Sequence, residues 1–387
     1  MGVGRFVYTP ILPLMHAQAG LSPQLGSMLA TANYVGYLLG ALAGIASPRL
    51  ARSRAALRIS LVVLIASLAA MPATRDAAAW FAVRLVAGGA SALVFIIAVN
   101  AVLTALRAHG PHLAGWAFGG VGAGIALSGG LVLALRSTGT WQQAWLLSAG
   151  ATVLLSIPAW NLRTGTAPSG PAAVRSQPGH DAAGPQDASG PRWFAALLAA
   201  YTLEGIGYIV AGTFLVAAID QSAPATVGSS AWVLVGLAAL PSAALWAWLS
   251  RTWSRPTLLI VAFIVQGAGI VLPVVVGGVG AALASAALFG GTFIGIAALV
   301  LAIGEHLRKP GAVAILTAGY SAGQVAGPLL ATPLLHHGYR QALVMAAVII
   351  AAAAVTAGAL RYRFPHHLGP LPLRMLTGAR NTTTSRS

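Results

Sequence analysis

Residues 77–106 read AAAWFAVRLVAGGASALVFIIAVNAVLTAL, an apolar stretch of 30 residues whose single charge is Arg84. A transmembrane helix needs about 20 consecutive, mostly apolar residues to cross the hydrocarbon core of a bilayer. This stretch is long enough, and similar stretches recur along the chain. The sequence therefore predicts an all-α membrane protein that crosses the bilayer many times.

The composition of the 387-residue chain excludes a soluble globular protein. Hydrophobic residues make up 57% and charged residues 7%, whereas a soluble domain carries about 25% charged residues. The absence of cysteine excludes disulfides, thiolate metal sites and cysteine nucleophiles. A net charge of +16 could suggest nucleic-acid binding, but most basic residues lie in short gaps between apolar segments, as topology determinants do. We therefore expect no nucleic-acid partner.

Twelve apolar segments can be marked as spans, at 1–17, 24–46, 57–73, 77–106, 113–135, 141–160, 193–219, 227–249, 258–276, 281–303, 312–335 and 342–360. Cytoplasmic loops are rich in Arg and Lys. Alternate gaps and the C-terminal tail hold 17 basic residues, and the opposite side holds only Arg75, Arg136 and Arg340. We therefore expect a multi-pass protein of the bacterial inner membrane with both termini in the cytoplasm.

Two segment boundaries need comment. The first span starts at Met1 with Arg5 only four residues in, so we expect a truncated first helix; the alternative is a naturally short, tilted span. Between the ninth and tenth spans, Pro273 and the cluster Gly277, Gly278 and Gly280 predict a turn.

The longest polar stretch divides the chain into two halves. Residues 163–192 are rich in Gly, Pro, Ala and Ser, a composition that cannot bury enough apolar surface to fold, so we expect a flexible cytoplasmic linker. It separates an N-terminal six-helix half, 1–162, from a C-terminal six-helix half, 193–364, and residues 365–387 form a cytoplasmic tail. Glycine motifs recur at a spacing of about 200 residues, as in 2–4 and 205–207. Repeated halves predict a transporter with its substrate site near the midplane.

Three ionisable residues lie well inside predicted spans: Arg5, Arg84 and Glu204. Charge inside hydrocarbon is costly, so such residues usually face a cavity or a partner. At 1.5 Å per residue, Glu204 lies about 16 Å into its span, near the midplane. Burial disfavours its charged form and a nearby arginine favours it, so Glu204 is the candidate proton carrier. The alternative is a static ion pair that fastens the two halves together.

Arg84 has two interpretations as well. Its guanidinium could anchor a substrate carboxylate or phosphate, or control the proton carrier. Alternatively, it bonds a backbone carbonyl or Glu204. Because two intramembrane cations face one carboxylate, one arginine is left to meet an anion, which weakly favours a substrate with an acidic group.

Polar and aromatic residues at helical spacing complete the candidate substrate-binding set. Tyr8 follows Arg5 by three positions and Tyr208 follows Glu204 by four, so each pair shares a helix face. The alternative for each residue is a hydrogen bond between helices. Glycines in the fifth and eleventh spans predict close helix packing. The set is Arg5, Tyr8, Asn33, Tyr37, Tyr201, Tyr208, Gln266, Tyr320 and Gln324.

Other chemistries find no support in the sequence. His336-His337 and His366-His367 are adjacent pairs whose rings diverge on a helix, with no third ligand nearby. No nucleophile, base and orienting acid can be assembled from so few acids. We therefore expect no metal, no cofactor and no enzymatic activity.

Several segments resemble the major facilitator superfamily. Val83 to Ala92, with Arg84 followed by Gly88, resembles the fourth-span motif, whose arginine is implicated in proton coupling in proton-linked members. The glycines from Gly120 to Gly130 resemble the antiporter motif, although Ile125 stands where that motif has proline, which weakens the case for antiport. The gap after the second span lacks the usual aspartate, so the cytoplasmic gate of many relatives could not be built in the same way here.

A closer resemblance is to the YbfB/YjiJ-type branch of bacterial transporters. It is carried by GVGRFVYTPILP at 2–13, EGIGY at 204–208 and GYSAGQVAGP at 319–328. The resemblance implies the major facilitator fold but names no substrate.

The sequence thus predicts a secondary transporter that moves a small organic solute by alternating access, with proton coupling through Glu204 and Arg84 and with export slightly favoured over import. We expect a monomer whose partners are the solute and the lipid bilayer. The alternative is a membrane receptor or assembly partner that binds a ligand without moving it, although no sizeable extramembrane domain is present to relay a signal. A channel would need a longer polar stripe.

Overall fold

The computed structural model describes residues 1–47, 49–105, 111–162, 190–221, 223–307, 309, 311–361 and 364. Within these ranges, only the backbone is described at 103–105, 111–117, 190, 225 and 337. All regular structure in the described part is helical, as the apolar segments predict. The helices are α1 (Gly2–Phe6), α2 (Tyr8–Ala19), α3 (Pro23–Ala46), α4 (Arg54–Ala70), α5 (Ala77–Ala105), α6 (Pro111–Leu135), α7 (Trp141–Trp160), α8 (Gly190–Asp220), α9 (Ala225–Leu249), α10 (Arg255–Val275), α11 (Gly278–His306), α12 (Ala312–Ala331) and α13 (Tyr339–Gly358), with short 3-10 turns η1 (Leu50–Arg52), η2 (Met71–Ala73), η3 (Thr332–His337) and η4 (Ala359–Arg361).

Ten segments in the described part of the chain are long and apolar enough to cross a membrane, from Pro23–Ala46 to Tyr339–Arg361. The chain is therefore a multi-pass membrane protein. Two of the twelve predicted spans are not among these ten. The first corresponds to α1 and α2, which are short, and the sixth to α7, a 20-residue helix with adjacent glutamines at 142 and 143.

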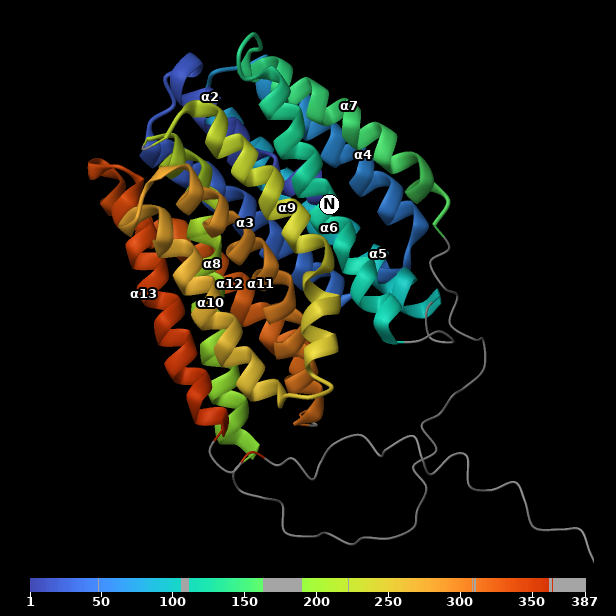
Figure 1. Ribbon diagram of the computed structural model, residues 1–387. Coiled ribbons are helices and arrows are strands. Elements are labelled where there is room, and N and C mark those ends of the chain that lie inside the picture. Colours follow the sequence, from blue (N-terminus) through green and yellow to red (C-terminus); the bar gives the residue numbers. More distant parts are fainter. Residues whose placement is uncertain are drawn as a thin grey trace, which may run out of the picture.

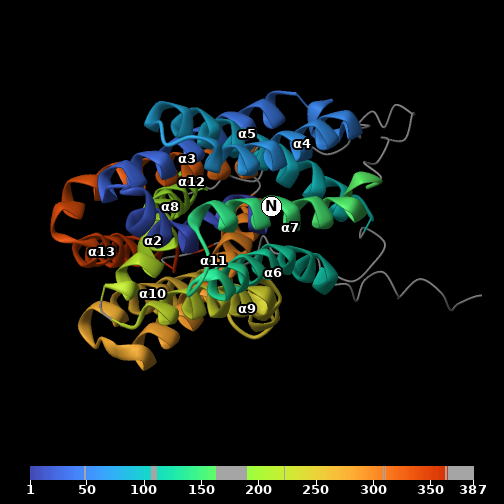
Figure 2. The same ribbon diagram turned by 90° about the horizontal axis from the view of Figure 1, so that it is seen from above.

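The first helical segment lies inside the bundle. Val7, between α1 and α2, keeps helical dihedral angles, so the two helices follow one another without a loop. Every residue from Gly2 to Leu12 is buried, and the N-terminus lies among the other helices in both views (Figures 1 and 2). A helix that is buried all round belongs to the core of a helical protein.

Seen from above, α4 and α5 lie along one side of the bundle and α9 and α10 along the other, with α2, α7 and α8 between them (Figure 2). Helices that precede residue 163 pack against elements that follow residue 189. α6 packs along α9, α3 packs along α12 and η3, and α2 packs against α8 and α9. The predicted linker, 163–192, lies outside the described residues except for 190–192, which begin α8, and the predicted tail, 365–387, lies wholly outside them.

The turn between the ninth and tenth predicted spans forms at the glycines. Gly277 and Gly278 adopt φ angles of 70° and 78° between α10 and α11, a left-handed conformation that glycine adopts without steric cost. Pro273, by contrast, lies inside α10. Its assignment to the turn was therefore wrong: the missing amide hydrogen of the proline does not prevent the helix from continuing to Val275.

Close helix packing by glycine is confirmed for part of the predicted set. A Cβ at Gly122 of α6 would lie 2.6 Å from the backbone nitrogen of Leu240 and 2.7 Å from the carbonyl oxygen of Gly236, both on α9. A side chain there would push the two backbones apart. Gly120 and Gly130, on the same helix, have nothing within 4 Å of the point that a Cβ would occupy, so they do not serve this contact.

Candidate functional site

The eleven residues singled out in the sequence lie in the interior of the bundle. All are buried except Tyr320, which is half-buried. The three charged ones are 6% exposed for Arg5, 1% for Arg84 and 0% for Glu204, so none of them faces lipid. We call these eleven residues the central cluster: Arg5, Tyr8, Asn33, Tyr37, Arg84, Tyr201, Glu204, Tyr208, Gln266, Tyr320 and Gln324.

Arg5 joins the first helix to α3 and α12. Its Nη2 donates a hydrogen bond to Oε1 of Gln324 at 2.5 Å, and its guanidinium carbon lies 3.8 Å from the centre of the Tyr37 ring. The rings of Phe6 and Tyr34 lie 5.3 and 5.6 Å away. Arginine over an aromatic face is a favourable electrostatic contact, so this guanidinium is surrounded by π-faces and one amide.

Arg84 on α5 has a similar aromatic environment. Its guanidinium carbon lies 4.6 Å from the centre of the Tyr8 ring and 6.0 Å from that of Trp145 on α7. Tyr8, expected to share a helix face with Arg5, contacts the other arginine with its ring, and its hydroxyl donates to the carbonyl of Gly26 at 2.9 Å. Asn33 donates from Nδ2 to the backbone carbonyl of Arg84 at 3.0 Å, a bond between α3 and α5.

Glu204 lies on α8, on the other side of the cluster. Gln266 of α10 donates from Nε2 to its Oε1 at 3.3 Å, and its second carboxyl oxygen has no hydrogen-bond partner. Among the residues that the structure describes, the only ion pair within 4.0 Å is that of Arg136 with Asp220. The static pair between Glu204 and an intramembrane arginine, one of the two sequence interpretations, is therefore not formed here.

Aromatic rings connect the region of Glu204 with that of Arg5. Tyr201 stacks on Tyr320 with a centroid distance of 4.4 Å, and Tyr320 lies 5.9 Å from Tyr208. Tyr208 in turn stacks on Phe293 at 5.2 Å and Phe289 at 5.8 Å, both on α11. Stacked rings bury a large apolar area and hold one another in place, so the cluster has a rigid aromatic wall.

The residues of this region that sequence reasoning missed include Tyr34, Trp145, Phe289 and Phe293. Tyr34 precedes Tyr37 by three positions and bonds Thr213 of α8 at 2.9 Å, so the helical spacing could have revealed it. The two phenylalanines and the tryptophan gave no signal, because aromatic residues in an apolar span are indistinguishable from core residues.

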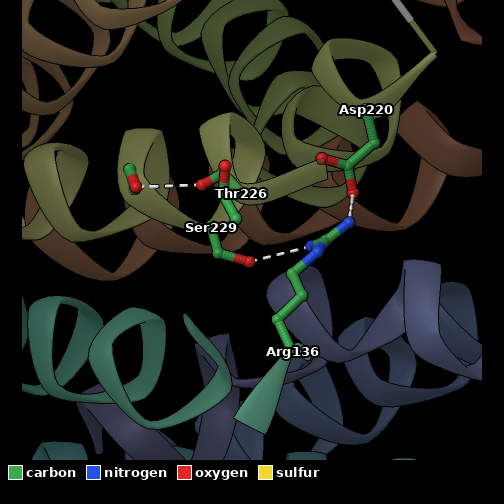
Figure 3. Close-up of polar contacts among 5 residues, drawn as sticks. Arg136, Asp220, Thr226 and Ser229 are labelled. Carbon is green, nitrogen blue, oxygen red and sulfur yellow. Dashed lines mark hydrogen bonds and ion pairs between the residues drawn. The ribbon is translucent and has the colours of Figure 1, made fainter. Parts of the chain in front are cut away.

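A second polar group lies at one end of the bundle. Arg136, just after α6, forms an ion pair with Asp220 at the end of α8 and donates to the hydroxyl of Ser229 on α9 at 2.8 Å (Figure 3). The Arg136 and Asp220 side chains are 10% and 11% exposed. We call these three residues the latch. At the same end, Nε2 of His16 lies 2.5 Å from the Tyr339 hydroxyl, and Ser27 donates to the carbonyl of Pro328 at 2.8 Å.

No group of three or more potential metal ligands occurs among the described residues. His336 lies 3.3 Å from the amide of Gln24, and the pair at 366–367 lies outside the described part of the chain.

Comparison with known proteins identifies the architecture. A crystal structure of an aspartate-to-alanine mutant of the nucleoside transporter NupG is similar over 93% of this chain and 97% of that chain, with a TM-score of 0.68 and 13% sequence identity. At that identity the likeness shows the fold alone. A search of curated proteins gives no match.

The family comparison covers most of the chain. Residues 1–361 match the family model described as "Uncharacterised MFS-type transporter YbfB". This confirms the resemblance seen in the first, seventh and eleventh predicted spans, and it makes the chain a transporter rather than an enzyme. The chain belongs to the YbfB-type family of major facilitator transporters.

Proposed function

We propose that this protein is a secondary active transporter that moves a small organic solute with an acidic group by alternating access, coupled to protons through Glu204. The observation that carries the proposal is the burial of Arg5, Arg84 and Glu204 in one interior cluster without an ion pair between them. Unpaired charge in the interior of a membrane protein is costly and usually marks a transport pathway.

The proposed topology has twelve spans in two six-helix halves, with both termini in the cytoplasm of a bacterial inner membrane. α1 and α2 together form the first span and α7 the sixth. The distribution of arginines between the predicted spans supports this orientation. The contacts between helices of the two proposed halves, among them α6 with α9, α3 with α12 and α2 with α8, then form the surfaces along which one half rocks against the other.

The latch lies at the proposed outer end, opposite the arginine-rich gaps. It joins Arg136 of the first half to Asp220 and Ser229 of the second. His16 and Tyr339 form a second link between the halves at this end. These contacts support a state that is closed toward the outside, and outward opening must break them.

Glu204 is suited to carry the proton. Only one of its oxygens accepts a hydrogen bond, from Gln266, and no arginine pairs with it. A carboxylate without a fixed counter-ion can gain and lose a proton as its surroundings change from dry to wet. The positive charge of Arg84 would influence how readily Glu204 gains and loses its proton. We favour export over import as the direction of solute movement.

The receptor alternative is separated from transport by counterflow. Purified protein is reconstituted into vesicles preloaded with an unlabelled solute selected by ligand stabilisation, and uptake of the labelled solute is followed. A transporter exchanges the two pools across the bilayer, whereas a receptor shows only binding that saturates at one solute per protein. An inside-acid or outside-acid pH gradient then reveals the direction and the coupling.

A further inference from the structure

We propose that the substrate is an organic monocarboxylate with an apolar body, and that Arg5 and Arg84 bind its carboxylate. This inference rests on the proposed function and names the substrate class of the same site. It follows from three features of the central cluster: the unused donors of the arginines, the charge balance, and the aromatic rings around them.

The two guanidiniums have hydrogen-bond donors that none of the described residues accepts. Nε of Arg5 and both Nε and Nη1 of Arg84 are buried and have no acceptor. Nearly all buried polar groups in proteins are hydrogen-bonded, so each exception needs an explanation. Carboxylate is the acceptor that best fits a guanidinium, because its two oxygens match the fork of N–H groups.

The charge balance of the cluster indicates a substrate with a single negative charge. Two guanidiniums and one carboxylate leave one positive charge in excess when Glu204 is ionised. The guanidinium carbon of Arg84 lies 4.6 Å from the centre of the ring of Tyr8, three positions after Arg5. No carboxylate of the described residues pairs with either arginine. A monoanion bound at the two guanidiniums neutralises the excess.

Apart from the arginines, the amides of the cluster offer a substrate few free donors. The amide nitrogens of Asn33 and Gln266 already donate within the protein, whereas Oδ1 of Asn33, Oε1 of Gln266 and Oε2 of Glu204 accept no hydrogen bond from the described residues. The stacked rings of tyrosines and phenylalanines lie beside these groups. A flat or aliphatic substrate body can contact these rings.

The test uses a pair of probes of nearly the same shape, of which only one carries a charge. Benzoate and benzamide have nearly the same shape, and uridine represents a polar, uncharged solute. Binding to the full-length protein in detergent at pH 7.5 is measured by calorimetry and by ligand-induced thermal stabilisation. Binding is preferred to uptake for this purpose because the protonated acid crosses bilayers unaided.

We expect benzoate to bind at least about tenfold more tightly than benzamide or uridine. Arg84→Gln and Arg5→Gln should each weaken benzoate binding by at least about tenfold and leave benzamide binding unchanged. Arg84→Lys should lose less benzoate affinity than Arg84→Gln. Arg58→Gln is the matched control, because Arg58 is half-buried at the end of the bundle and bonds the carbonyl of Trp160. Size-exclusion chromatography identifies any variant that fails to fold, and the remaining arginine variant then carries the test.

Equal affinity for benzoate and benzamide, or benzoate binding that survives both glutamine substitutions, would overturn the substrate class. Uridine binding that exceeds benzoate binding, together with uridine counterflow in vesicles, would overturn the substrate class while leaving the transport function standing. Absence of counterflow for every solute that binds would instead overturn the proposed function.

Discussion

Neutralising Asp220 should open the outer end of the protein. The Asp220→Asn substitution keeps the size of the side chain and one acceptor oxygen but removes the charge that Arg136 pairs with. Both side chains are about nine-tenths buried. The free energy lost on breaking this ion pair therefore lies between that of an exposed pair, up to about 1 kcal/mol, and that of a fully buried pair, about 3–5 kcal/mol. We take about 2 kcal/mol, which is about 30-fold in an equilibrium constant.

That loss applies only to the state in which the latch is closed. If the outward-open state holds about 1% of the molecules, a 30-fold shift raises it to about a quarter. The chain contains no cysteine, so a single introduced cysteine reports this population without background labelling. Thr31→Cys is a suitable reporter, because Thr31 is buried in α3 near the latch end and its hydroxyl bonds only within its own helix.

The assay measures the rate at which a membrane-impermeant maleimide labels this cysteine from outside. We expect Asp220→Asn and Arg136→Gln each to raise the rate by up to about 30-fold, and the pair of substitutions to add little to either one, since both remove the same contact. Arg340→Gln is the control, because Arg340 is an exposed arginine that bonds the carbonyl of Val274. Unchanged labelling in both latch variants, with normal folding, would refute the assignment of the latch as a gate.

Two further predictions concern packing. Gly122→Ala should destabilise the protein by about 1–3 kcal/mol, because the added Cβ meets the backbone of α9. Gly130→Ala on the same helix should be neutral or stabilising by up to about 1 kcal/mol. Equal denaturation midpoints of the two variants in detergent would contradict this prediction. Tyr37→Phe should keep the ring contact with Arg5 and change the stability of the protein little, but Tyr37→Ala should lower the stability by about 3 kcal/mol. An equal loss of stability in both variants would show that the stabilisation comes from the hydroxyl and not from the ring.

The sequence was sufficient to predict the helices because the physical signal for a span is local. The length of an apolar run, as in 77–105 of α5, is enough to mark a helix. Boundaries were less certain: α4 begins at Arg54, where Ser53 caps the helix, rather than at 57. The first helix was hardest to predict, because it is short yet buried on every side.

The burial of the three intramembrane charges could be predicted, but most of the contacts in the central cluster could not. Arg5, Arg84 and Glu204 could be recognised because ionisable residues inside spans are rare, since a charge in the hydrocarbon core is energetically costly. Which side chains they meet depends on how helices far apart in sequence pack together, as with Arg5 and Gln324, 319 positions apart. The latch could not be predicted for the same reason. Arg136 and Asp220 lie in different predicted loops, and the sequence gives no indication that their side chains meet.

The central claim is that Glu204 couples solute movement to protons, and the most direct test compares exchange with accumulation in the Glu204→Gln variant. Glutamine preserves the shape and an acceptor for Gln266 but cannot release a proton. We predict that vesicles containing this variant retain solute counterflow and lose all accumulation driven by a pH gradient. Accumulation equal to that of the unmodified protein would contradict the claim and exclude Glu204 from the mechanism.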